Sequence, residues 1–288
     1  MAGAPTDSRR RLGAELRRLR RSADMSGPDL ARLLQIGQAT VSRMETGQVR
    51  PSIETVRRWL SATRAPRDVR TRVLQLAEDA QVEVSGWRSV FRGGMAPQQR
   101  AMHAFDEAAI AIRHFQPFMI PGYFQPAEYA KAAILGFRLT DEVTDIDDAV
   151  QARLERANKL RRRTKTPYHL VITELGLRLL PAGATTKARS NAWRSLLAAT
   201  ELRHVTVQVI RADAPVNQAP VCGWMMYDMP VSAIDPLVVQ VETPAALLTF
   251  TGADVQPFEL AWDRMVSSAC NPEESAHLIR GLLADEDH

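Results

Sequence analysis

The stretch Met25–Pro51, MSGPDLARLLQIGQATVSRMETGQVRP, predicts two short helices joined by a tight turn. Ser26 is a residue type that caps helix N-termini, and Pro28 then falls in the first turn of the first helix. Gln35–Gly37 would form the turn, and a second helix is expected over Gln38–Thr46, where the glycine that follows ends it. The stretch therefore indicates a helical hairpin around which the N-terminal part of the chain is organised.

In the second of these helices, Val41 and Met44 lie three residues apart and are expected to face inward. The outer face then presents short polar side chains and one arginine, at Gln38, Ala39, Ser42 and Arg43. The major groove of DNA admits a helix, and there Arg pairs bidentately with guanine and Gln with adenine. These four residues are therefore candidates for contacts with base edges.

The hairpin resembles the helix-turn-helix of the phage-repressor (Cro/C1, XRE) family. The residues that carry the likeness are Ala31, Ile36, Val41, Met44, the ending Glu45-Thr46-Gly47 and Pro51. The resemblance implies that the four outer-face residues contact bases and that Glu45 is buried in an ion pair with Arg20. Two positions depart from the family. Gln35 replaces the usual glycine of the turn, which predicts a positive φ at a cost of roughly 1 kcal/mol, and Gly27 replaces a glutamine that often clamps a phosphate.

The segments on either side predict three more helices, so that the first 80 residues hold five. Three leucines at i, i+4 and i+7 form one stripe of a helix over residues 7–22, and arginines cover its other face. Among them, Arg17 is a candidate phosphate contact, which adds affinity but no sequence choice. In the family, the loop and the helix N-terminus after the hairpin lie at a phosphate, so Arg50 and Ser52 are further candidates.

The charge of the chain is uneven. Residues 1–80 hold 16 Arg and 9 Asp or Glu, a net charge of +7, whereas the rest holds 21 Lys or Arg and 24 Asp or Glu, a net charge of −3. This balance is typical of a nucleic-acid-binding head on a body that does not bind nucleic acid. There is no run of about 18 apolar residues and no secretory signal, and the two cysteines, Cys222 and Cys270, make no disulfide framework or zinc site. We therefore expect a cytoplasmic protein without a membrane span.

A length of 288 residues suits two domains. The sequence predicts a helix-turn-helix domain over residues 1–80, a linker over residues 81–97 and an α/β domain over residues 98–288. The last of these would open with a helix over residues 98–114. Its strands are expected over residues 169–173, 205–211, 221–227, 237–242 and 246–251. Its other helices are expected from about residue 126, over residues 145–160, and over residues 187–200, 254–269 and 272–283. The fold class is thus an all-α five-helix head followed by an α/β domain with a mixed sheet.

A second resemblance begins at Phe115–Ala130, FQPFMIPGYFQPAEYA. This segment is similar to the signature that opens the C-terminal domain of the WhiJ-like actinobacterial regulators, and the likeness continues through residues 153–163, 168–179, 237–250 and 258–283. The resemblance implies an antitoxin-like transcriptional regulator whose C-terminal domain binds a small acidic partner protein. It assigns no catalytic role to any residue.

Signatures of common enzymes are absent from the sequence. There is no G-x-G-x-x-G, Walker loop, G-x-S-x-G elbow or H-E-x-x-H, and the six histidines lack metal-ligand spacing. The acidic residues over 141–148 lack the glycine and ligand period of a cation loop, and a helix N-terminus at Asp145 explains them. The sequence therefore predicts a protein that is not an enzyme, with no catalytic residues, no cofactor and no metal.

The sequence leaves more than one function open. The first is a sequence-specific transcriptional regulator that binds double-stranded operator DNA as a homodimer and a small acidic protein through its body. An alternative is a one-component sensor with a small-molecule pocket in the C-terminal domain, lined by Trp224, Met226 and Phe250. A pocket would favour the sensor, and a large exposed apolar patch would favour the partner protein. A third reading, a helix-turn-helix that binds protein and not DNA, has only Gly27 and Gln35 as support.

Overall fold

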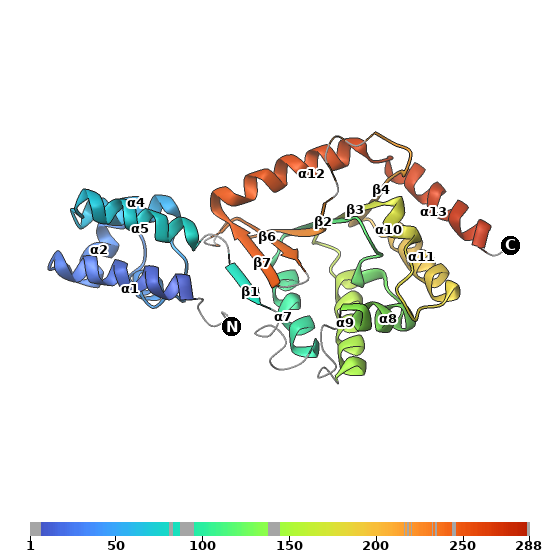
Figure 1. Ribbon diagram of the computed structural model, residues 1–288, viewed down its shortest axis with the longest axis horizontal. Coiled ribbons are helices and arrows are strands. Elements are labelled where there is room, and N and C mark those ends of the chain that lie inside the picture. Colours follow the sequence, from blue (N-terminus) through green and yellow to red (C-terminus); the bar gives the residue numbers. More distant parts are fainter. Residues whose placement is uncertain are drawn as a thin grey trace. The chain divides into compact units, whose positions relative to one another are not determined.

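The computed structural model of the protein (Figure 1) divides the chain into two compact units. The N-terminal unit consists of Met1–Glu83 with Phe250–Asp254, and the C-terminal unit of Val84–Thr249 with Val255–His288. The predicted tail at residues 1–6 and the linker residues Trp87 and Phe91 lie outside the described residues. The structure describes residues 7–80, 83–86, 95–137, 145–215, 217, 219, 221–231, 233, 235–243 and 246–286.

The N-terminal unit is built from the five helices that the sequence predicts. They are α1 (Asp7–Ser22), α2 (Gly27–Leu34), α3 (Gln38–Glu45), α4 (Ile53–Ala62) and α5 (Arg67–Asp79). Their apolar faces form one core, in which Leu12, Leu16, Leu30 and Trp59 are each 0% exposed. The Trp59 indole donates Nε1–H to the carbonyl of Leu16 at 3.1 Å, so the largest core side chain also has its polar atom satisfied.

Local signals set the ends of these helices. The Ser26 hydroxyl accepts the Asp29 N–H at the start of α2, and the Ser52 hydroxyl accepts the Thr55 N–H at the start of α4. Gln35 ends α2 with φ 54° and ψ 42°, in the left-handed region that the sequence predicts for it. Gly47, with φ 73°, follows α3. The hairpin geometry therefore comes from caps within the quoted stretch.

The C-terminal unit contains a mixed sheet of the order β1-β7-β6-β5-β2-β3-β4. Strands β2, β3 and β4 are parallel, whereas β2–β5 and β5–β6 are antiparallel. The strands are β1 (Glu83–Gly86), β2 (Ala111–Gln116), β3 (Tyr168–Thr173), β4 (Val205–Ile210), β5 (Trp224–Asp228), β6 (Leu237–Glu242) and β7 (Ala246–Thr251). The helices are α7 (Met95–Ala108), η1 (Gly122–Phe124), α8 (Ala127–Phe137), α9 (Ile146–Arg162), α10 (Glu174–Arg178), α11 (Thr186–Thr200), η2 (Gly252–Val255), α12 (Gln256–Ser268) and α13 (Pro272–Glu286). The predicted fold class is confirmed.

One predicted element is wrong in a way that matters for the sheet. The sequence predicts a single helix over residues 98–114, but α7 ends at Ala108 and Ala111–Gln116 forms the strand β2. The side chains of β2 alternate, so Ile112 and His114 face one side of the sheet while Arg113 and Phe115 face the other. This strand has β3 on one side and β5 on the other, and the sheet changes there from parallel to antiparallel pairing.

Helices cover both faces of this sheet. On the face of Ile112 and His114, a large core cluster contains Tyr129 of α8, Leu160 of α9 and Trp193 of α11. On the opposite face, α12 brings the Trp262 ring to 5.0 Å from the ring of His169. Figure 1 shows α12 on one side of the strands and α8 and α9 on the other.

Candidate functional site

The outer face of α3 presents the four side chains that the sequence singles out. Gln38, Ala39, Ser42 and Arg43 are all exposed, while Val41 and Met44 on the inner face are 1% and 4% exposed. The helix is only eight residues long, and an isolated helix of that length does not persist in water. Its geometry therefore depends on how the rest of the unit holds it.

Two glycines let α1 approach the end of α3 closely. A Cβ on Gly13 of α1 would lie 2.5 Å from the carbonyl oxygen of Met44 and 2.8 Å from that of Glu45, distances at which the backbone itself must move. A Cβ on Gly47 would meet the backbone of Arg9 and Arg10 at 3.1 Å. Gly13 is not among the residues that the sequence singles out. A glycine inside an amphipathic helix is the signal that points to such a close approach.

An ion pair fixes the same end of α3 to α1. Arg20 donates Nε–H to Glu45 Oε1 at 2.5 Å and Nη2–H to Glu45 Oε2 at 2.9 Å. Arg20 also donates to the carbonyl of Met25 at 2.8 Å, just before α2. The Glu45 side chain is 8% exposed, and Arg17 Nε lies 3.8 Å from its Oε2 while remaining half exposed. The pair links three helices of the unit, and Arg17 is held beside the end of α3.

The Arg43 guanidinium is directed by its own helix. Its Nε–H donates to the Ala39 carbonyl at 3.3 Å, one turn back. The terminal nitrogens make no hydrogen bond to any residue that the structure describes, so both remain available for a bidentate acceptor such as the O6 and N7 edge of guanine.

The two residues predicted at phosphates after the hairpin lie in different environments. Ser52 is exposed at the N-terminus of α4, where backbone N–H groups attract anions. Arg50 is only 5% exposed, and its Nη1 donates to the carbonyl of Ala80 at the end of α5. In this conformation Arg50 joins α5 to the loop, and a phosphate cannot reach it without movement of the side chain.

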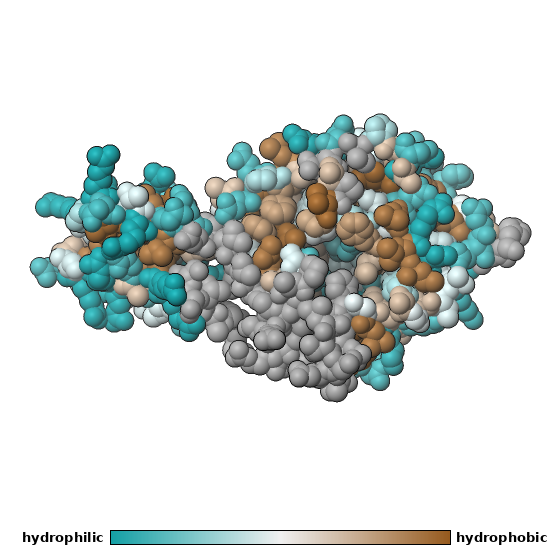
Figure 2. Space-filling model, viewed as in Figure 1, coloured by the Kyte–Doolittle hydropathy of each residue, from teal (hydrophilic) through white to brown (hydrophobic). Residues whose placement is uncertain are grey.

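Several other arginines of the unit are also engaged within the protein. Arg18 and Arg72 both donate to Glu15, and the hydrogen bond from Arg18 is the main cause that lowers the pKa of Glu15 to about 2. Arg58 donates to the carbonyl of Leu34 at 2.6 Å and so satisfies the end of α2. Figure 2 shows hydrophilic side chains over most of the visible face of the N-terminal unit, in keeping with its excess of arginine.

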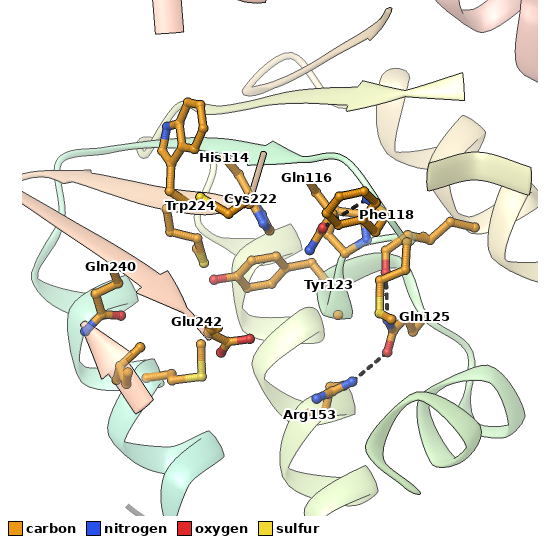
Figure 3. Close-up of a pocket in the computed structure, with 18 of the residues that line it drawn as sticks. His114, Gln116, Phe118, Tyr123, Gln125, Arg153, Cys222, Trp224, Gln240 and Glu242 are labelled. Atoms are coloured by element: carbon orange, nitrogen blue, oxygen red, sulfur yellow. Dashed lines mark hydrogen bonds between the residues drawn. The ribbon is translucent and has the colours of Figure 1, made fainter. Parts of the chain in front are cut away.

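The C-terminal unit contains a cavity of about 370 Å³ on the His114 side of the sheet, at the end of β2 (Figure 3). Of the three residues that the sequence places in a pocket, Trp224 borders the cavity, whereas Met226 and Phe250 do not line it. The Trp224 ring packs at 4.6 Å from the ring of Phe115, on the opposite face of the sheet. The polar residues that line the cavity were missed by the sequence analysis, because they come from strands and helices far apart in the chain.

Three residues that line this cavity, His114, Tyr123 and Arg156, belong to a buried polar network. Arg156, which is 8% exposed, donates Nε–H to Asp106 Oδ2 at 2.5 Å and Nη2–H to Asp106 Oδ1 at 3.1 Å. The Tyr123 hydroxyl donates to the same carboxylate at 2.7 Å, and the Arg156 guanidinium lies 4.6 Å from the centre of the Tyr123 ring. His114 Nδ1 bonds the Tyr168 hydroxyl at 2.7 Å. Burial, together with the Arg156 cation, lowers the pKa of His114 to about 3, so its ring is neutral at pH 7.

Within the described ranges, no group of three His, Cys, Asp or Glu side chains is arranged to hold a metal ion. Both cysteines are free thiols and are half buried. None of the helices in the part of the chain that the structure describes has the length and apolar composition needed to cross a membrane.

The N-terminal unit has the fold and the exposed second helix of a DNA-binding helix-turn-helix protein. Comparison with known families agrees, since residues 11–73 match a family described as a helix-turn-helix domain. Residues 99–281 match the family described as domain of unknown function DUF5753, and the chain, more than half of which this match covers, belongs to that family. No curated protein matches the chain.

Proposed function

We propose that this protein is a sequence-specific, dimeric transcriptional regulator of the repressor type that binds double-stranded operator DNA and catalyses no reaction. The observation that supports this most is α3, which exposes Gln38, Ala39, Ser42 and Arg43 together on a helix held by α1. Such a helix fits the major groove, where these side chains reach base edges. The site of action would be the bacterial cytoplasm, at the nucleoid.

Phosphate contacts would place α3 in the groove. Ser52 at the N-terminus of α4 and Arg17 beside Glu45 are the two predicted contacts that are exposed. Arg50 would take part only after leaving its contact with Ala80. Phosphate contacts of this kind supply affinity that falls as salt rises.

Arg43→Ala tests the base-reading role. We expect it to cost about 1–3 kcal/mol on the best DNA site and to relax the preference at one base pair. Arg17→Ala is the control, because loss of a phosphate contact weakens binding to all sequences alike and lowers the salt slope by about one. An equal loss on every DNA sequence in the Arg43→Ala variant would refute base reading by Arg43.

The DNA sequence of the operator can be determined by letting the purified protein select genomic DNA fragments at low and at near-physiological salt. A two-fold-symmetric motif that survives the higher salt would support a dimer with half-sites about 34–36 Å apart. If the protein retains all DNA fragments alike, and retains none at the higher salt, its binding comes from phosphate contacts alone. That result would contradict the proposal.

For the C-terminal unit we propose a role in pairing and in binding a small acidic protein, as the likeness to WhiJ-like regulators implies. Among the described residues, Leu33 is the only exposed large hydrophobic residue of the N-terminal unit, while the C-terminal unit exposes Ile110, Phe118, Leu135, Leu175, Leu179, Val221, Val231 and Leu260. Figure 2 shows several such hydrophobic areas on the visible face of this unit. The basic last turn of α9, with Lys159, Arg161 and Arg162, suits an acidic partner.

Light scattering of the purified protein tests whether two copies of the chain form a dimer.

The cavity favours a second candidate for the same unit, a sensor of a small molecule. Its volume of about 370 Å³ lies in the range of ligand sites, and its lining mixes apolar side chains with a few polar groups. In this case the ligand, and not a protein, would change the affinity for DNA.

A further inference from the structure

The cavity lies where ligands bind in open α/β sheets, beyond the carboxyl end of a strand at which the topology changes. Strand β2 is that strand, because it pairs in parallel with β3 and antiparallel with β5. After Gln116 the chain turns into the segment 118–122, which forms one wall of the cavity. Gly223 also lines the cavity, and a Cβ at this position would come within 3.2 Å of the Gln116 side-chain oxygen.

Two opposite charges enter this cavity from different elements. Arg153 comes from α9 and Glu242 from the end of β6, and Figure 3 shows both side chains at the cavity. They form no ion pair within 4.0 Å, although each is near enough to influence the pKa of the other. The Arg153 side chain is partly exposed, and the loss of solvent around it lowers its pKa to about 10, whereas Glu242 is exposed at the end of β6 and its carboxylate is open to the cavity. Because the two charged groups are not paired with each other, both can contact a bound ligand.

Arg153 is held so that part of its guanidinium faces the cavity. Its Nη1–H donates to Gln125 Oε1 at 2.7 Å, and Gln125 in turn donates Nε2–H to the carbonyl of Ile120 at 2.6 Å. Gln125 is 4% exposed and therefore fixed. Arg153 Nε and Nη2 bond to none of the residues that the structure describes, which leaves donors for a bound anion.

A buried amide in the cavity wall also has an unused acceptor. Gln240 is 5% exposed, and its Oε1 has no hydrogen-bond partner in the described part of the chain. It stands in one row across the sheet with Met225 and His114. An unsatisfied buried polar atom destabilises the fold, so a ligand that donates a hydrogen bond here would relieve that cost.

The rest of the lining is apolar and adaptable. Met102, Phe118, Met119, Met225 and Leu247 line the cavity beside the polar groups. Methionine side chains are flexible and polarisable, so they accommodate apolar groups of different shape. His114 is neutral and Arg156 is paired with Asp106, so the charges left for a ligand are those of Arg153 and Glu242.

We propose that this cavity binds a small zwitterion with an apolar side chain, of the chemical class of the free hydrophobic α-amino acids, whose carboxylate lies at Arg153 and whose ammonium group lies at Glu242 and Gln240. A simple carboxylate would face Glu242 with like charge, and a simple amine would face Arg153 with like charge. Only a molecule with both groups matches both residues. The proposal rests on the sensor role of the C-terminal unit.

The test is calorimetric titration of the purified full chain, without DNA, with each of the common L-amino acids. The same titration is repeated with the amide of each ligand, which lacks the carboxylate, and with its N-acetyl form, which lacks the ammonium group. We expect saturable binding of one or a few hydrophobic amino acids, and binding about ten- to a hundredfold weaker for both derivatives, since each loses a charged hydrogen bond.

Two variants separate recognition from damage to the fold. Arg153→Gln should bind the amide as well as it binds the acid, and Glu242→Gln should bind the N-acetyl form as well as the free amino acid. Each variant should thus lose the preference for one charged group of the ligand and keep the preference for the other. A misfolded protein would lose both preferences. Arg211→Gln is the control, because Arg211 forms an ion pair with Asp213 on the surface. This variant should bind all ligands as the wild type does.

The proposal is overturned if no amino acid binds the wild type, or if the two variants keep both discriminations. Because the titration contains no DNA, its failure is distinguishable from a failure of operator binding. A protein that binds its operator and no amino acid would retain the DNA-binding function and lose this inference.

Discussion

The two units of this protein place their charges in different ways. In the N-terminal unit most charged side chains are at the surface, and the least exposed pair, Arg20 and Glu45, lies at the end of α3 and fixes it. In the C-terminal unit Arg156 and Asp106 are buried together, and Arg153 and Glu242 share a cavity. The contrast teaches that a charged pair fixes a helix end near the surface in one unit, whereas a charged pair is buried inside the fold in the other. The following variants test that difference.

The largest effect is expected from Asp106→Asn. This change leaves the Arg156 cation buried without a counter-ion, and loss of one partner of a buried pair costs about 3–5 kcal/mol. Urea unfolding should show the C-terminal unit destabilised by this amount while DNA binding persists. Asp228→Asn is the control, because the Arg113–Asp228 pair is about a quarter exposed and should cost less. Equal effects of the two variants would remove the distinction between the buried and the surface pair.

A pH effect should come from His114. Its pKa in the folded protein is about 3, below its value of 6.5 when unfolded, so the neutral form is the one that the fold stabilises. The stability that it contributes is therefore complete above pH 6.5 and is lost as the pH falls toward 3, by about 1.4 kcal/mol per pH unit. Unfolding free energies at pH 7 and pH 5 should differ less in His114→Gln than in the wild type. His277→Gln, an exposed histidine on α13, should leave the slope unchanged.

Gly13→Ala tests how closely α1 must approach α3. Alanine normally favours a helix by about 1 kcal/mol over glycine, but here its Cβ would meet backbone carbonyls at 2.5 and 2.8 Å. We expect a net loss of about 1–3 kcal/mol in the N-terminal unit and weaker operator binding. Gly281→Ala in α13 is the matched control, because nothing lies within 4 Å of its added Cβ, and it should be neutral or stabilising. Thermal melts of both variants make the comparison.

The smallest effect, and a gain, is expected from Gly27→Gln. A Cβ at this position meets only Gln38 Cγ, at 3.9 Å, so the fold accepts a side chain there. A glutamine would add one phosphate contact, worth about 0.5–1.5 kcal/mol, on all DNA sequences alike. Gly27→Ala supplies the backbone change without the amide. If both variants bind DNA equally well, position 27 does not face a phosphate.

The N-terminal unit was more predictable than the C-terminal unit because its signals are local. Capping by Ser26 and Ser52 and the positive φ of Gln35 all follow from residues within a few positions of each other. The inward orientation of the Val41 and Met44 side chains follows from helical spacing alone. The burial of Arg50 could not be predicted, because its partner, Ala80, lies 30 residues away and no pattern connects them.

In the C-terminal unit the sequence predicts five of the strands but neither β1, which lies within the predicted linker, nor β2. Ile112 continues the helical spacing of Met102, Phe105 and Ala109, so the sequence pattern predicts a helix where the structure has a short alternating strand. Short apolar runs do not distinguish the two by periodicity alone. The cavity was beyond prediction for a different reason, since Arg153 and Glu242 meet only after α9 and β6 have packed onto the same sheet.

The contacts that hold α3 also bear on the entropy of binding. Gly13 allows the backbones to touch and Glu45 ties the helix end to Arg20, so the recognition helix is ordered before it meets DNA. The conformational entropy lost on binding is then that of a few exposed side chains, about 0.5–1.5 kcal/mol for each long one. No segment of the chain has to fold when the protein binds. If the proposed function holds, a preorganised helix of this kind would select among DNA sequences by how long it stays bound to each one, because its rate of association is set by charge and is nearly the same for all.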